Sequence, residues 1–109
     1  MMNELNISYF YSDSGPEVGG IILTNKSTIK LNNVAKNLDE DFELSEDDLV
    51  LLDDENTYGT FHTHPGRGAN LSIIDYLTFK KYPRLVHYII GKDGVKCYKM
   101  QGGILIEKS

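Results

Sequence analysis

The chain has 109 residues, 40% of them hydrophobic, and a formal net charge of −5. This length fits a single compact domain over residues 1–109 and excludes large catalytic scaffolds such as a (β/α)8 barrel, which needs about 250 residues. The acidic balance argues against a nucleic-acid-binding protein, because such proteins normally carry a basic footprint.

The N-terminal half predicts strands and one short helix. Residues 7–11 are rich in aromatic side chains and predict a strand. Residues 17–24 predict a mostly buried strand, and residues 28–34 predict its hairpin partner. Ser45 has an acid three residues later and an apolar run behind it, so it predicts the capped start of a short helix over 46–52.

The region around this helix is strongly acidic. Residues 39–55 contain ten of the sixteen carboxylates and no Lys or Arg. We interpret this run as a solvated acidic face. The alternative interpretation is a surface that steers a basic partner segment toward the protein.

The C-terminal half predicts one longer helix between strands. Residues 58–62 predict a strand, and residues 73–81 predict a helix that a proline ends. Residues 85–90 and 95–100 predict an antiparallel pair joined by a turn, and residues 104–107 predict a last strand. The order of elements predicts an α/β or α+β fold, in which one or two helices pack on a mixed β-sheet.

One stretch combines two histidines, a serine and an aspartate. His62 and His64 project from the same face of a strand because side chains alternate, so their imidazoles can share one metal ion. The following loop delivers Ser72 and Asp75 to the first turn of a helix, where the helix dipole favours an anionic ligand. Two imidazoles and one carboxylate leave a fourth position free for water, which is the pattern of a catalytic zinc site.

These residues resemble the motif of the JAMM (JAB/MPN-plus, Mov34-type) metalloproteases. That family carries His-Ser/Thr-His-Pro, a spacer of six or seven residues, Ser-x-x-Asp, and an upstream Glu-x-x-Gly. This chain has His62-Thr63-His64-Pro65, a spacer over residues 66–71, and Ser72-Ile73-Ile74-Asp75. It also has Glu17-Val18-Gly19-Gly20 before an apolar run. The resemblance covers residues 16–100 and includes every motif residue in the right order.

The resemblance implies a JAB/MPN-like, cytidine-deaminase-like fold and a zinc-dependent peptidase or isopeptidase. One zinc ion per chain would be held by His62, His64 and Asp75. Glu17 would be the general base that activates a zinc-bound water, and Ser72 would stabilise the oxyanion. The substrate would be an amide bond in a peptide, or at the C-terminal tail of a ubiquitin-like or carrier protein. We expect a monomer or a homodimer.

Each part of the motif also has a structural explanation. Ser72 and Asp75 match an ordinary helix capping box. His62 and His64 can be polar residues of a half-buried strand, and Glu17 an ordinary surface carboxylate. The alternatives to a hydrolase are therefore a non-catalytic protein-interaction module on the same fold, or an enzyme that is active only with a partner.

Other polar residues are weaker candidates for a site. His87 fits a strand residue better than a metal ligand, and the single cysteine, Cys97, fits a packing role and excludes a disulfide framework. Arg67 and Asn70 follow the histidines, and substrate contact and ordinary loop polarity explain them equally well.

The sequence gives no sign of membrane association. Its longest apolar runs are too short to span a bilayer, and residues 1–4 do not resemble the basic start of a signal peptide. We therefore expect a cytoplasmic protein with neither a membrane nor a nucleic-acid partner.

Overall fold

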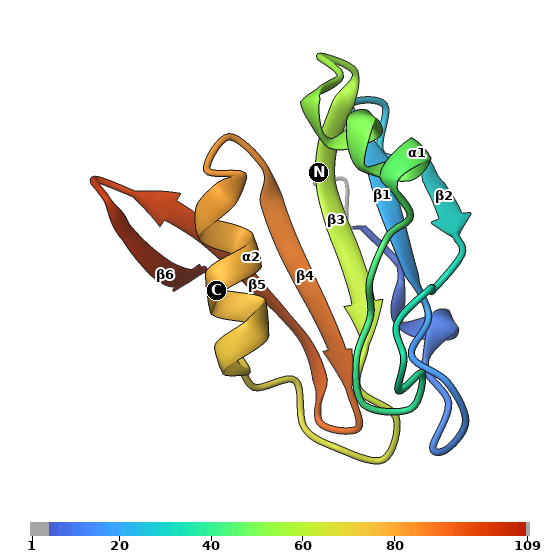
Figure 1. Ribbon diagram of the computed structural model, residues 1–109. Coiled ribbons are helices and arrows are strands. Elements are labelled where there is room, and N and C mark those ends of the chain that lie inside the picture. The colour runs from blue at the N-terminus through green and yellow to red at the C-terminus, as the bar shows by residue number, and fades with distance from the viewer. Residues whose placement is uncertain (1–4, 109) are drawn as a thin grey trace.

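The structure is a computed structural model that describes residues 5–108. Within this range six strands form one mixed sheet in the order β2-β1-β3-β4-β5-β6 (Figure 1). Two short α-helices and two 3-10 helices accompany the sheet. In chain order the elements are η1 (Ser8–Phe10), β1 (Gly19–Leu23), β2 (Thr28–Leu31), α1 (Glu46–Leu49), η2 (Val50–Asp53), β3 (Thr57–Thr63), α2 (Ile73–Lys81), β4 (Val86–Gly91), β5 (Gly94–Gln101) and β6 (Ile104–Lys108). The coarse prediction of an α+β fold with a mixed sheet is confirmed.

The pairing of the central strands determines which residues meet. Strand β3 pairs with β4 in parallel and with β1 in antiparallel fashion. The register between β1 and β3 places Gly19 opposite His62, so the segment just before β1 lies beside the end of β3. A parallel pair needs a crossover connection, and the connection between β3 and β4 contains α2.

Helix α2 lies against the face of the sheet at β4 and β5 (Figure 1). Its buried residue, Phe79, belongs to a cluster with Ile89 of β4 and Tyr98 of β5. The helix has nine residues, as the sequence predicted. Neither it nor any other helix between residues 5 and 108 is long and apolar enough to cross a membrane.

The opposite face of the sheet is covered by the N-terminal segment, where one prediction is wrong. Residues 7–11 were expected to form a strand, but Ser8–Phe10 is a 3-10 helix. Ile7 is buried, Phe10 stacks on Phe61 at 4.6 Å between ring centroids, and Tyr9 is 68% exposed. Burial therefore repeats after three residues, which suits a 3-10 helix and not the two-residue alternation of a strand.

The predicted helix over 46–52 is confirmed in part, because it divides into α1 and the 3-10 helix η2. The Oγ atom of Ser45 accepts a hydrogen bond from the backbone N–H of Asp48 at 3.2 Å, as the predicted cap requires. The 3-10 segment directs the Leu52 side chain toward the sheet, where it forms a buried cluster with Ile21 and Leu85. The surface helix thus contacts the sheet through its last turn.

The predicted strands at 17–24 and 28–34 are both shorter in the structure. Strand β2 ends at Leu31, and the side chain of Asn33 then bonds to the backbone on both sides of the next loop. Its amide donates to the carbonyls of Glu17 and Asp41, and its oxygen accepts from the N–H groups of Ala35 and Glu43. These bonds replace ladder bonds, so the chain leaves the sheet early.

Gly91, at the end of β4, lies against the loop that follows β3. A Cβ atom at this position would lie 2.3 Å from the backbone nitrogen of Ala69 and 2.8 Å from the carbonyl oxygen of Arg67. The N–H of Lys92 donates to that same Arg67 carbonyl at 2.8 Å. Only a residue without a side chain lets the loop pack this closely.

We expect Gly91→Ala to lower the free energy of unfolding by about 1–3 kcal/mol, because backbone atoms cannot yield to the added methyl group. Gly68→Ala is the matched control, since its Cβ would meet the Asp93 carboxylate at 3.2 Å, a side chain that can move. Urea unfolding of both variants measures the difference. Equal stabilities for the two variants would contradict this account of the loop.

Candidate metal centre

Three buried side chains bring atoms that can ligate a metal together beside the C-terminal end of β3, an interior strand of the sheet. The donor atoms of Glu17, His62 and His64 are all within 4.8 Å of one another. Glu17 precedes β1, His62 lies in β3, and His64 follows the last residue of that strand. Their residues are 3%, 7% and 4% exposed. Two imidazoles and a carboxylate are suitable ligands for a divalent metal, so this group could hold a metal ion.

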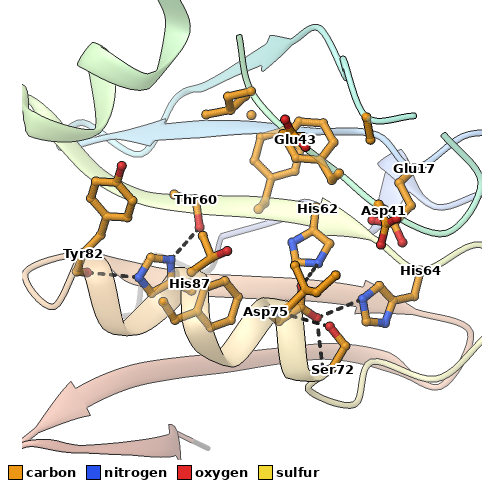
Figure 2. A pocket seen from close by; sticks show the side chains of 18 of the residues that line it. Glu17, Asp41, Glu43, Thr60, His62, His64, Ser72, Asp75, Tyr82 and His87 are labelled. Carbon is orange, nitrogen blue, oxygen red and sulfur yellow. Dashed lines mark hydrogen bonds and ion pairs between the residues drawn. The ribbon is translucent and has the colours of Figure 1, made fainter. Parts of the chain in front are cut away.

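Asp75 reaches the same two histidines from helix α2 (Figure 2). Its Oδ1 atom lies 3.0 Å from Nε2 of His62, and its Oδ2 atom lies 3.2 Å from Nε2 of His64. Because each contact uses a different oxygen, the carboxylate bridges the two rings.

Ser72 holds this aspartate in place. Its Oγ accepts a hydrogen bond from the N–H of Asp75 at 3.0 Å, and its own N–H donates to Oδ2 of Asp75 at 3.2 Å. The predicted capping box is therefore confirmed. It directs the Asp75 carboxylate toward the histidines, so the structural explanation of this pair and a role in the site are compatible.

Neighbouring groups also fix the histidine rings. Nδ1 of His64 donates a hydrogen bond to the Gly68 carbonyl oxygen at 3.0 Å, and Nε2 of the same ring faces Asp75. The ring of His62 lies between Phe42 and Phe79, each 6.2 Å away between centroids. A hydrogen bond to the far nitrogen is the usual way in which a protein orients a metal-binding histidine.

The charges in this group support one another. Burial alone would raise the pKa of Asp75, but hydrogen bonds from His62 and His64 outweigh it and hold that pKa well below its usual range. Burial lowers the pKa of His64, but its hydrogen bonds to Asp75 and to the Gly68 carbonyl, together with the nearby carboxylate charges, outweigh burial, so this pKa is raised. A metal ion bound here would compete with Asp75 for the Nε2 atoms of both rings.

Arg67, for which the sequence left substrate contact and ordinary loop polarity equally open, contacts the centre through Glu17. Its Nη2 atom lies 2.7 Å from Oε2 of Glu17. The Glu17 side chain is 2% exposed, whereas that of Arg67 is 44% exposed. Burial raises the pKa of Glu17, and the nearby His62 and Arg67 reduce the increase. A buried carboxylate needs a partner, and Arg67 is the one basic residue between positions 65 and 72.

The remaining candidates lie away from the donor group. His87 lies in β4, as predicted, and its ring nitrogens bond to Oγ1 of Thr60 at 2.7 Å and to the Tyr82 carbonyl at 3.1 Å. It also stacks on Phe79 at 4.1 Å between centroids. Asn70 accepts a hydrogen bond from Lys96. Both residues have local partners that account for them.

A cleft of about 510 Å³ runs from the donor group along the sheet, between α2 and residues 35–44. All five motif residues line it, namely Glu17, His62, His64, Ser72 and Asp75. Apolar side chains, including Phe42 and Phe79, form much of its wall, and Asp41 and Glu43 line the side opposite α2 (Figure 2).

We expect His87 to make the fold sensitive to acid. Burial lowers its pKa to about 4, below the ordinary value of 6.5, so the unfolded chain takes up this proton first as the pH falls. The stability that depends on neutral His87 is complete above pH 6.5 and is lost on the way to pH 4, by about 3 kcal/mol.

Urea unfolding at pH 7 and pH 4.5 tests this, with His87→Gln as the comparison, because glutamine cannot titrate. The variant should lose less stability than the wild type over this interval. An identical loss in both proteins would contradict the role assigned to His87.

Two comparisons with known proteins bear on this site. A scan against models of protein families gives no match, and neither does a search of curated proteins. Membership of the JAMM family therefore stays a prediction from the motif residues. The structure adds the donor group itself, since Glu17, His62 and His64 lie buried together and could hold a metal ion.

Proposed function

We propose that the protein is a zinc-dependent peptidase or isopeptidase of the JAMM type, with the JAB/MPN fold of that family. One observation carries the proposal. Residues from three separate parts of the sequence, in the order and spacing of the JAMM motif, line a single cleft. Helix capping, strand polarity and surface charge can each explain one of these residues, but they do not explain why all of them line the same cleft.

Two imidazoles and a carboxylate form a ligand set that suits zinc. Imidazole and carboxylate ligands at about 2.0–2.2 Å from a tetrahedral zinc lie about 3.3 Å from each other. One oxygen of Asp75 lies 3.0 Å from Nε2 of His62, which is close to that separation, and its other oxygen lies 3.2 Å from Nε2 of His64. We assign these three residues as ligands, one zinc per chain. Three protein ligands leave a position for water.

Two side chains of the cleft supply the remaining chemistry. A zinc ion held by His62, His64 and Asp75 would supply Lewis acidity and would lower the pKa of a bound water to about 7. The Glu17 carboxylate takes the proton of the attacking water and passes it to the leaving amine. Oγ of Ser72 already accepts a bond from the Asp75 N–H, so its own hydrogen is available to donate to the developing oxyanion.

The surface beside the cleft favours a protein or peptide substrate. Three apolar side chains of α2 are open to solvent, namely Ile73, Ile74 and Leu77, with exposed fractions of 80%, 57% and 54%. Ile74 also lines the cleft. Apolar side chains that gather at the surface are typical of interaction sites. A flexible tail of a ubiquitin-like or carrier protein, or a free peptide, would place its amide bond at the donor group.

The same apolar surface favours a second candidate, a protein-interaction module without catalysis. The two functions differ in their need for Glu17. An interaction module keeps its binding when Glu17 is replaced by glutamine, whereas a hydrolase loses turnover while its substrate and metal still bind.

We expect one zinc per purified chain, a strong loss of zinc in His64→Ala, and full zinc content in Glu17→Gln. Elemental mass spectrometry of protein prepared without chelator measures this. Glu17→Gln should also lower hydrolysis of a peptide library by about 10²–10⁴-fold, because it removes the base. A wild type that binds no zinc even after zinc is added would refute the hydrolase.

The role of Ser72 can be separated from helix capping. Ser72→Ala and Ser45→Ala each remove an N-cap hydroxyl, and each should lower stability by about 1 kcal/mol. Only Ser72→Ala should also lower kcat, by about 10²–10³-fold, because only Ser72 lies in the cleft. Thermal unfolding and turnover of the two variants provide the comparison. Equal turnover in the two variants would mean that Ser72 caps the helix and has no role in catalysis.

A further inference from the structure

The centre contains one more candidate ligand than a catalytic metal site needs. Asp75 contacts both histidines, and the Glu17 carboxylate lies within 4.8 Å of the donor atoms of the same two rings. Three protein ligands leave a position for water, whereas four protein ligands give the closed shell of a structural zinc site. The position of Glu17 therefore decides which kind of site this is.

Arg67 is the residue that fixes this position. The 2.7 Å contact between its Nη2 and Oε2 of Glu17 is a short, charge-assisted hydrogen bond. Within residues 5–108, Arg67 is the one side chain that forms an ion pair with Glu17. One carboxylate oxygen of Glu17 is thus already bonded to a guanidinium.

The backbone of Arg67 is hydrogen-bonded on both sides, so the point from which its side chain starts has a defined place. Its N–H donates to the His64 carbonyl at 3.0 Å, and its carbonyl accepts from the N–H of Lys92 at 2.8 Å. The close approach of Gly91 secures the same loop. The side chain is nonetheless 44% exposed, so it can be replaced without opening a cavity in the core.

We infer that Arg67 is a positioning residue that keeps the metal centre open by holding Glu17 outside the coordination shell. The inference rests on the proposed function, because it requires a metal ion at the histidine pair. Without the guanidinium, Glu17 is a buried carboxylate with no ion-pair partner, which is a costly state. The metal is then the nearest positive charge, and Glu17 becomes the fourth protein ligand.

A double-mutant cycle with Arg67→Gln and Glu17→Gln tests this through metal affinity. Zn²⁺ affinity is measured by competition with a chromophoric chelator. Arg67→Gln alone should bind Zn²⁺ about tenfold more tightly than the wild type, because it gains a ligand. In the Glu17→Gln background the same change should have less than about a twofold effect, since no carboxylate can move in.

A second measurement reports the open position directly. In the Co²⁺-loaded wild type, added azide should change the visible absorption spectrum by occupying the free site. In Co²⁺-loaded Arg67→Gln that response should be lost, because Glu17 fills the position, and Glu17→Gln in the same background should restore it. Arg67→Lys keeps a positive charge beside Glu17, so the Co²⁺-loaded variant should respond to azide as the wild type does.

Two controls separate this mechanism from a general effect of charge. Lys92→Gln removes one positive charge from the turn that bonds to Arg67 and should leave Zn²⁺ affinity unchanged. If Arg67→Gln unfolds, as circular dichroism would show, Arg67→Met keeps the apolar stem and replaces it in the cycle.

The outcomes distinguish the two proposals. A wild type that binds no metal overturns the proposed function itself. A wild type that binds one metal, with unchanged affinity and azide response in Arg67→Gln, overturns the role of Arg67 alone. An affinity gain of equal size in both Glu17 backgrounds also overturns it, because Arg67 would then act on the metal only through its charge.

Discussion

The bridge from the Asp75 carboxylate to Nε2 of His62 and His64 is the contact on which the arrangement of this protein depends. The Asp75 side chain is 13% exposed, and a carboxylate buried to that extent costs on the order of several kcal/mol unless it is paired. Two imidazoles and the N–H of Ser72 supply the pairing. The bridge joins the start of α2 to the end of β3, and so places the helix that forms one wall of the cleft.

The two faces of the sheet differ in the side chains that they carry. The face under the N-terminal segment is apolar, and its core consists of Ile7, Ile22, Phe61 and Ile90. The face under α2 carries polar side chains among aromatic ones, with Phe79 stacked on His87 and in edge contact with His62. Packing on the first face can therefore stabilise the fold, while the polar side chains of the second face line the cleft.

Local rules were enough to predict much of this from the sequence. Alternation along β3 predicted that His62 and His64 share a face, and the spacing of Ser72 and Asp75 predicted the capping box. The 3-10 turn at Ser8–Phe10 could not be predicted, because it depends on which side chains the sheet buries. The pairing of Arg67 with Glu17 joins residues fifty positions apart, and no local pattern reports such a contact.

The two carboxylates of the centre occupy environments that push their pKa values in opposite directions. Hydrogen bonds from both histidines hold the pKa of Asp75 far below its usual range, so its charge is permanent, as a metal ligand requires. Burial raises the pKa of Glu17 even though Arg67 and His62 oppose the shift, and a raised pKa suits a group that must take up and release a proton. Paired groups with diverging pKa values commonly have different chemical roles. The surroundings of the two carboxylates therefore support the proposed division, with Asp75 as ligand and Glu17 as base, alongside their places in the motif.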